Sequence, residues 1–433
     1  MMSRMQRRKP WYKKPAGICG IAAAVLVIVG LVLFFALRDS GSKDPDVSDD
    51  PSVEVPNGKQ DDIPADVPID EEPPEQIDPN PEPGAESVIK AGSNHGSFTA
   101  AGSLTEGQKQ AIFDYMDSYY SSLAGLAVKE VGNPFYGSDI ASREKGAWNT
   151  IIDVRKSALE DLSASNYSFT LRVTGVNTSD GTAHIALIED NTQQFRALSV
   201  LTEQFNVAHD FWLKRDGSLW KVSDHKCNNG LFYSYKHDSS AGRDGRYSTI
   251  MSYITQRHSQ FDAQGNSPAV TCDNTYDRTA AYNYMMKWVG ARNSNWTKFD
   301  DWGGNCQNFA SQVLTAGGIP MNSRWYWKSA GNVTSSWINV GGFTDYAASA
   351  SATEMVCDAN ANYYDGDVGD VLLIGIENAR SHATVISAVV KDDAGRTVDY
   401  LLCSNTNDLR NFPAGAYHSS NQRLFRIFGW NNG

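Results

Sequence analysis

Between about residues 100 and 226, the spacing of apolar residues changes from a helical period to a strand period. Thr105 and Gln108 form the capping-box pattern that marks the start of a helix. After them, two sets of apolar residues recur at helical spacing: Ile112, Tyr115 or Met116, Tyr119 and Leu123, and then Trp148, Ile151, Ile152 and Leu159. Apolar and polar residues alternate over 167–174 and again over 205–213, which predicts half-buried antiparallel strands. The pattern predicts two helices followed by a sheet, an α+β domain.

This order of elements resembles the cone-shaped α+β fold of the nuclear-transport-factor-like and cystatin-like superfamily, in which helices precede a curved meander. The predicted meander closes on a Trp-Lys-Val strand at 220–222. Three histidines, His184, His209 and His225, lie on or near its strands without forming a concentrated catalytic set. We interpret the domain over 100–226 as a spacer or as a module that positions substrate.

A second α+β domain is predicted over 272–431, after a connection over 227–270 that is rich in Ser, Gly, Asp and Tyr. Its informative helix starts at Cys306, directly after Gly303, Gly304 and Asn305, and ends before Gly317. The buried face of this helix is predicted to be Phe309, Ala310, Val313 and Leu314. Free N–H groups and the helix dipole lower the pKa of a cysteine at a helix start, which favours the nucleophilic thiolate.

The strands after this helix carry residues that can act on such a thiolate. His382 lies near the mouth of a hairpin predicted from strands over 369–374 and 381–386, and it can serve as a base. Asn405 ends a third strand over 400–405, and its side-chain oxygen can orient the imidazole. A cysteine on a leading helix, followed by a histidine and a polar residue on successive strands, is the order of a papain-like site.

Blocks of this domain resemble the putative amidase domain of bacterial surface proteins. They are Gly-Gly-Asn-Cys306-Gln-Asn-Phe-Ala-Ser-Gln, the following Gly-Gly-Ile-Pro-Met, Trp325-Tyr326-Trp327, Ser336-Trp337, Gly369-Asp370-Val, Ser381-His382-Ala and Ser404-Asn405-Thr406-Asn407-Asp408. That family belongs with the papain-like fold and is similar in layout to the CHAP amidases and cell-wall peptidases. The resemblance implies the catalytic residues Cys306, His382 and Asn405. The family more often has Asp before the nucleophile and His at the third position, where this chain has Asn305 and Asn405.

The start of the chain contains one long apolar run. Residues 16–37 include no charge, and at 1.5 Å per residue these 22 residues span about the 30 Å of a bilayer core. Six Lys or Arg residues precede the run and only Arg38 directly follows it, so the positive-inside rule predicts a cytoplasmic tail over 1–15, one transmembrane anchor over 16–38 and an extracellular C-terminal region. A cleavable signal peptide is the alternative, but Ala-Leu-Arg-Asp-Ser after Phe35 makes a poor cleavage site.

Composition separates a linker over 39–95. Residues 41–90 hold 15 Asp or Glu against three Lys, and residues 39–90 hold ten of the 16 prolines. Such a segment cannot form a core, and we predict a disordered, acidic, Pro-rich linker. The net charge of −12 for the whole chain argues against a nucleic-acid binder.

Five cysteines follow the apolar run, and full pairing of an odd number leaves at least one thiol free. We expect that thiol to be Cys306, with the pairs Cys227–Cys272 and Cys357–Cys403 favoured for the others. No Cys or His pair has zinc-site spacing and the usual phosphate loop is missing, so we expect no metal or cofactor.

These features predict a single-pass membrane protein with an extracellular cysteine hydrolase. The predicted reaction is cleavage of an amide bond in peptidoglycan, either in the stem peptides or where they join the glycan. In it Cys306 attacks, His382 moves the proton and Asn405 holds His382 in the right tautomer. Two alternatives remain open: a non-catalytic cell-wall-binding module that has kept the cleft, and an acyl transferase that uses the same triad.

Overall fold

The structure is a computed structural model that describes residues 95–228, 240–267, 269–376, 379–417, 419 and 421–433. The predicted cytoplasmic tail over 1–15, the predicted anchor over 16–38 and all but the last residue of the predicted linker over 39–95 lie outside the described residues.

The predicted membrane anchor requires a correction. Within the described ranges, none of the helices is both long enough and apolar enough to cross a membrane. The longest, α2 (Glu106–Gly125), is amphipathic, because Glu106, Lys109 and other charged residues occupy its outer face while its apolar face is buried. For the part of the chain that the structure describes, the fold class with a transmembrane helix and the single-pass membrane location are therefore wrong. The fold is α+β with one large mixed sheet.

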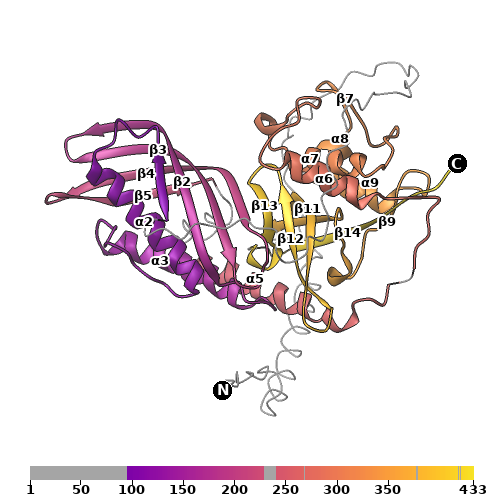
Figure 1. Cartoon of the computed structure of the whole chain (residues 1–433), viewed down its shortest axis with the longest axis horizontal. Helices are drawn as coiled ribbons and strands as arrows, with labels where there is room; N and C mark the ends of the chain where they lie inside the picture. The colour runs from indigo at the N-terminus through magenta and orange to yellow at the C-terminus, as the bar shows by residue number, and fades with distance from the viewer. Residues whose placement is uncertain (1–94, 229–239, 268, 377–378, 418, 420) are drawn as a thin grey trace, which may run out of the picture. The chain divides into compact units, whose positions relative to one another are not determined.

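The first group of elements contains two helices and five strands (Figure 1). They are β1 (Gly96–Thr99), α2, α3 (Ser138–Lys156), β2 (Ala164–Ser179), β3 (Thr182–Phe195), β4 (Thr202–Asp216) and β5 (Leu219–Cys227). The capping box is present: Thr105 Oγ1 accepts from the Gln108 N–H, and Gln108 Oε1 accepts from the Thr105 N–H at 2.9 Å. The second helix ends at Lys156, so Leu159, which the spacing placed on its apolar face, lies outside it and is exposed.

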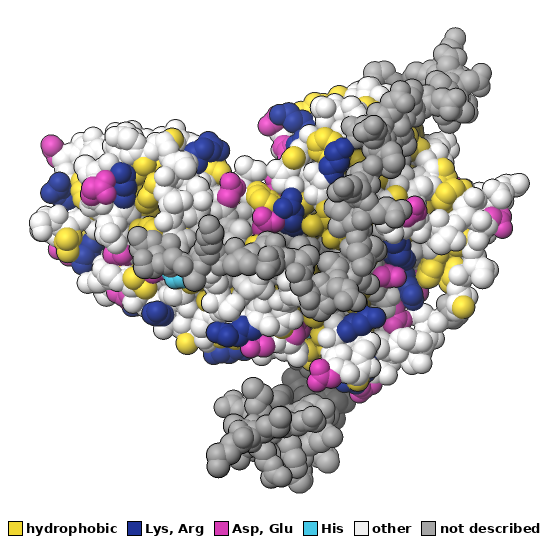
Figure 2. Space-filling model, viewed as in Figure 1, with side chains coloured by type: hydrophobic (Ala, Val, Ile, Leu, Met, Phe, Trp, Pro, Cys, Tyr) yellow, Lys and Arg dark blue, Asp and Glu magenta, His cyan; other side chains and the backbone are white. Residues whose placement is uncertain are grey.

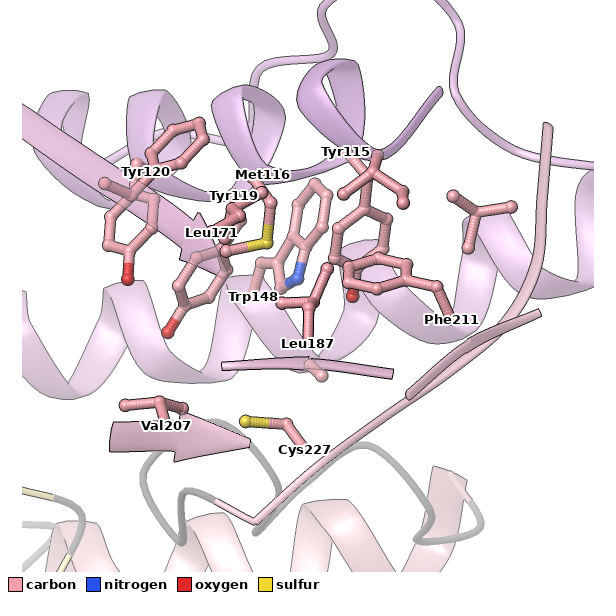
Figure 3. Close-up of a cluster of buried hydrophobic side chains, with 14 of the residues drawn as sticks. Tyr115, Met116, Tyr119, Tyr120, Trp148, Leu171, Leu187, Val207, Phe211 and Cys227 are labelled. Carbon is pink, nitrogen blue, oxygen red and sulfur yellow. The ribbon is translucent and has the colours of Figure 1, made fainter. Parts of the chain in front are cut away.

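Helices α2 and α3 bury aromatic side chains against the strands (Figure 3). The ring of Tyr115 lies edge-on to Trp148 and to Phe211, with centroids 5.8 and 5.3 Å away. Cys227 is buried in the same cluster. This cluster is the apolar core that the alternating strand pattern predicts.

The remaining elements begin with α5 (Ser240–His258) and end with a strand at the C-terminus. The helices are α6 (Arg278–Trp288), α7 (Cys306–Ala316), α8 (Ser335–Ile338) and α9 (Val340–Ser349), with short 3₁₀ turns at 261–263, 300–302, 363–365 and 414–416. The strands are β6 (Asn274–Thr275), β7 (Trp327–Ser329), β8 (Asn332–Val333), β9 (Val356–Asp358), β10 (Val371–Ile376), β11 (Ala379–Lys391), β12 (Thr397–Ser404), β13 (Asp408–Pro413) and β14 (Asn421–Trp430). Helices α6, α7 and α9 contact β11 on one face of the sheet (Figure 1).

Strands of both predicted domains are hydrogen-bonded into one 12-stranded sheet. Its order is β1-β2-β3-β4-β13-β12-β11-β10-β14-β6, with β5 beside β4 and β9 beside β14. The join is the antiparallel pair β4–β13, where Asp408 lies opposite Phe205. The sheet is mixed because β1 and β2 run parallel. The periodicity of the sequence does not predict the pairing of β4 with β13. That pairing depends on which strand lies beside each strand, whereas periodicity depends only on the spacing of residues within a strand.

Charged side chains of both signs are interspersed on the face shown in Figure 2. One ion pair crosses the β4–β13 join, where Arg410 Nη1 lies 2.7 Å from Glu203 Oε2.

All five cysteines of the described residues are free thiols. The predicted pairs Cys227–Cys272 and Cys357–Cys403 are therefore wrong. Cys227 lies in the core under α2 and α3, Cys403 is buried in β12, and the Cys357 thiol donates to the carbonyl of Ala347 at 3.3 Å. Each of these three sulfur atoms packs against other residues and is not bonded to a second cysteine.

Candidate active site

Cys306 is the first residue of α7, as the sequence predicts. Two glycines in left-handed conformations, Gly303 (φ 105°) and Gly304 (φ 130°), turn the chain into this helix. The apolar face of α7 packs into the cluster that covers β11, and the Cys306 side chain is 9 % exposed. The thiol therefore lies at the buried end of the helix that faces the strand of His382.

The structure brings the segments of Cys306 and His382 together. His382 lies on β11 opposite Ile374 of β10, and it is 9 % exposed. The backbone N–H of Ala383, the next residue along β11, lies close enough to the Cys306 thiol to favour its thiolate form. The N–H groups of Cys306 and Gln307 at the helix start also act on this sulfur.

The pKa of the Cys306 thiol is raised above its usual 9.0, because burial disfavours the thiolate more than the surrounding N–H groups favour it. The expected net lowering by the helix start is thus wrong: the N–H contribution is present, but burial outweighs it. The thiol is protonated at neutral pH.

Burial lowers the pKa of His382 to about 4, because it disfavours the charged imidazolium. The imidazole is therefore neutral at neutral pH. Its Nε2 lies 3.2 Å from Ser404 Oγ, whereas Nδ1 makes no hydrogen bond to the part of the chain that the structure describes. Among the described residues, no hydrogen bond joins the imidazole to the Cys306 thiol, although α7 packs on β11. A neutral imidazole with one uncommitted nitrogen can accept a thiol proton once the two groups come within hydrogen-bond reach.

Asn405, which the sequence places beside His382, has other partners. Its Oδ1 accepts from Asn305 Nδ2 at 3.1 Å, and its Nδ2 lies 3.5 Å from the carbonyl oxygen of Trp288. Strand β12 ends at Ser404, and consecutive side chains of a strand point to opposite faces, so Ser404 meets His382 while Asn405 does not. The sequence shows two polar residues in a row, Ser404 and Asn405, and the alternation along the strand decides which of them faces His382. The prediction names Asn405, whereas Ser404 makes the contact.

The turn after Ser404 is connected to the loop before Cys306. Thr406 Oγ1 accepts from the Asn305 N–H at 2.6 Å, and Asp408 Oδ1 accepts from the Thr406 N–H at 2.7 Å. Arg292 Nη2 donates to Asp408 Oδ1 at 3.0 Å and to Asp300 Oδ1 at 2.7 Å. Arg292 thus joins Asp300, in the loop before Cys306, to Asp408, which follows the turn after Ser404.

One aromatic residue contacts His382, and another lies four residues before Cys306 in the sequence. The ring of Tyr417 stacks on His382 with centroids 6.1 Å apart, and burial, with a smaller contribution from Cys306, raises the pKa of its phenol. Trp302, four residues before Cys306, is 69 % exposed. Tyr417 thus covers the imidazole, while Trp302 presents an indole to solvent close to the nucleophile in sequence.

A second buried polar cluster, missed by the sequence reasoning, lies under α2 and α3. His209 Nδ1 lies 2.8 Å from His225 Nε2, His209 Nε2 lies 2.9 Å from Glu189 Oε2, and Tyr115 links His225 to Glu144. These side chains are at most 2 % exposed. Within the described ranges, no three His, Cys, Asp or Glu residues are grouped so as to hold a metal ion. The alternating strands placed His209 on the buried side, but its partners are 16 and 20 residues away, beyond any local pattern.

In a comparison with known families, residues 275–428 match the family described as "Putative amidase domain". The description of that family refers to amidase activity. A curated relative, "Uncharacterized protein YjcM" of Bacillus subtilis (strain 168), is 34 % identical over 110 residues, which are 24 % of this chain and 25 % of the relative. The chain thus matches about a quarter of that relative's length. No solved structure matches the chain. The likeness to papain-like enzymes, to CHAP amidases and to the nuclear-transport-factor-like superfamily stays a prediction.

Proposed function

We propose that the domain matched over 275–428 is a cysteine amidase in which Cys306 is the nucleophile and His382 the base. The observation that carries this proposal is the placement of the Cys306 thiol at the start of α7 against the backbone N–H of Ala383, the neighbour of His382. Cys306 supplies the nucleophile and His382 the base. The N–H groups at the start of α7 supply hydrogen-bond donors that can stabilise a negatively charged oxygen.

In the proposed reaction, His382 Nδ1 accepts the thiol proton while the sulfur attacks the carbonyl carbon of the amide. Negative charge moves to the carbonyl oxygen of a tetrahedral intermediate, and N–H groups at the start of α7 are suited to stabilise it. The C–N bond then breaks, the amine leaves with the proton from His382, and a thioester remains on Cys306. Water, deprotonated by His382, attacks the thioester and releases the acid and the thiol.

The two pKa shifts define the resting state of this pair. Burial raises the pKa of Cys306 and lowers that of His382, so both groups are neutral before substrate binds. Negative charge on the sulfur and on the substrate oxygen therefore develops only during the attack. The N–H groups of α7 and of Ala383 stabilise that negative charge.

The proposed substrate is an amide of a cell-wall peptide, in the peptidoglycan stem peptides or at their junction with the glycan. The resemblance of the motif blocks to cell-wall amidases and peptidases supports this choice. A peptide amide presents the planar carbonyl that a thiolate attacks, and no cofactor is needed for the reaction.

The test uses the full chain incubated with purified cell walls, with mass spectrometry of the soluble products. We expect fragments with new amine and carboxyl ends from the unaltered protein and none from Cys306→Ala. Cys357→Ala is the matched control, since its thiol packs against Ala347 and has no part in the reaction.

Each contrary outcome has a distinct meaning. Fragment release by Cys306→Ala would overturn the nucleophile assignment. Sedimentation of the protein with walls without fragment release would identify a binding module, and products that form only with an added amine would identify an acyl transferase.

A further inference from the structure

His382 has one hydrogen-bonding partner among the described residues, and it is Ser404. Ser404 Oγ lies 3.2 Å from His382 Nε2 and 3.1 Å from the carbonyl oxygen of Asn407. A carbonyl oxygen can only accept, so the single hydroxyl hydrogen of Ser404 is donated to Asn407. The Ser404 oxygen is then left as an acceptor, and Nε2 of His382 must carry the hydrogen.

We infer that Ser404 is the positioning residue of His382. It holds the imidazole in the Nε2–H tautomer, which leaves Nδ1 unprotonated and able to take a proton from the Cys306 thiol. This inference rests on the proposed function and assigns to Ser404 the role that the sequence reasoning gave to Asn405. Ser404 is fully buried, so water does not compete for the hydrogen bond.

The turn that follows Ser404 is built to keep this acceptor in place. Asn407, whose carbonyl receives the Ser404 hydrogen, and Thr406 both have left-handed backbones, with φ of 52° and 65°. A β-branched residue rarely adopts this conformation, and it persists only where the surroundings enforce it. Here Asp408 binds the Thr406 N–H and the Thr406 hydroxyl binds the Asn305 N–H, so both ends of the strained residue are fixed.

Asn405 cannot take the same role in this arrangement. Among the described residues its side chain bonds to Asn305 and to the carbonyl of Trp288, and it makes no hydrogen bond to His382. Strand β12 directs Ser404, the residue before it, toward the imidazole instead.

The test compares Ser404→Ala with Asn405→Ala in the full chain. Ser404→Ala removes one buried oxygen and should lower kcat about tenfold at unchanged KM, the factor expected for one net hydrogen bond. The ¹⁵N NMR signals of His382 should show Nε2–H in the unaltered protein and a mixture of tautomers in Ser404→Ala. Asn405→Ala should leave the Nε2–H tautomer unchanged, because the hydrogen bonds of its side chain go to Asn305 and Trp288 and not to the ring.

The tautomer readout separates a positioning role from a merely structural one. Full activity of Ser404→Ala with an unchanged tautomer would overturn the inference, as would a tautomer change in Asn405→Ala alone. Failure of the proposed function is a different result, namely activity of Cys306→Ala, and the NMR measurement stays interpretable in that case because it needs no substrate.

Discussion

Asn305 donates from Nδ2 to Oδ1 of Asn405 at 3.1 Å, across 100 residues of sequence. Both side chains are 2 % exposed. Asn305 directly precedes Cys306, and Asn405 directly follows Ser404, so this bond joins the start of α7 to the end of β12. The resemblance to the amidase family predicts other residues at these two positions, and in space the two positions form one contact.

We therefore predict that Asn305 and Asn405 are energetically coupled. Removing either side chain leaves a buried amide without its partner, and each single alanine variant should lose about 1–3 kcal/mol of unfolding free energy. The double variant should lose less than the sum of the two, because no unpaired partner remains. Urea denaturation of the four proteins measures the coupling, and strictly additive losses would show that the contact contributes nothing.

The pH dependence of activity should reflect the buried imidazole. Because the pKa of His382 is lowered to about 4, the base stays neutral down to that pH, and the acid limb of kcat/KM should lie near pH 4 and not near 6.5. The raised pKa of Cys306 predicts that its alkylation by iodoacetamide is slow at pH 7 and accelerates as pH rises past 9. Fast alkylation at pH 6 would instead indicate a preformed thiolate.

His382 should also make stability depend on pH. Its pKa is lower in the folded state, about 4, than in the unfolded state, about 6.5, so the unfolded chain binds the extra proton between these values. Stability should consequently fall as pH drops from about 6.5 to 4, by about 3 kcal/mol from this group. Chemical denaturation at several pH values should show this loss in the unaltered protein, and a smaller loss in His382→Asn.

The buried cluster under α2 and α3 should matter for stability rather than catalysis. Burial lowers the pKa of His209, but Cys227 and Glu189 outweigh it and raise that pKa to about 10, so His209 is charged and lies 2.9 Å from Glu189. Glu189→Gln leaves this buried charge without its carboxylate and should cost about 3–5 kcal/mol of unfolding free energy.

Asp216→Asn is the matched control for that experiment, because the carboxylate of Asp216, which forms an ion pair with Lys221, is exposed. It should cost less than about 1 kcal/mol. Equal losses in Glu189→Gln and Asp216→Asn would contradict a charged His209–Glu189 pair.

Local features of the sequence determined several elements of this protein. The capping box at Thr105 and Gln108, the strand alternation that puts His209 on the buried side, and the helix start at Cys306 are all present in the structure. Each depends on residues within about one turn or one strand of each other, so the spacing of side chains is sufficient to fix it.

Only the tertiary structure decided what those elements contact. It selects Ser404 over Asn405 for His382, joins β4 to β13, keeps the cysteines apart and pairs His209 with His225 and Glu189. It also reverses the expected shift of the Cys306 pKa, because the cost of burying a thiolate depends on everything packed around the sulfur and not on its position in the helix. A shift of one residue in strand register exchanges the two faces of a strand, and that choice is made by distant packing that the local pattern does not contain.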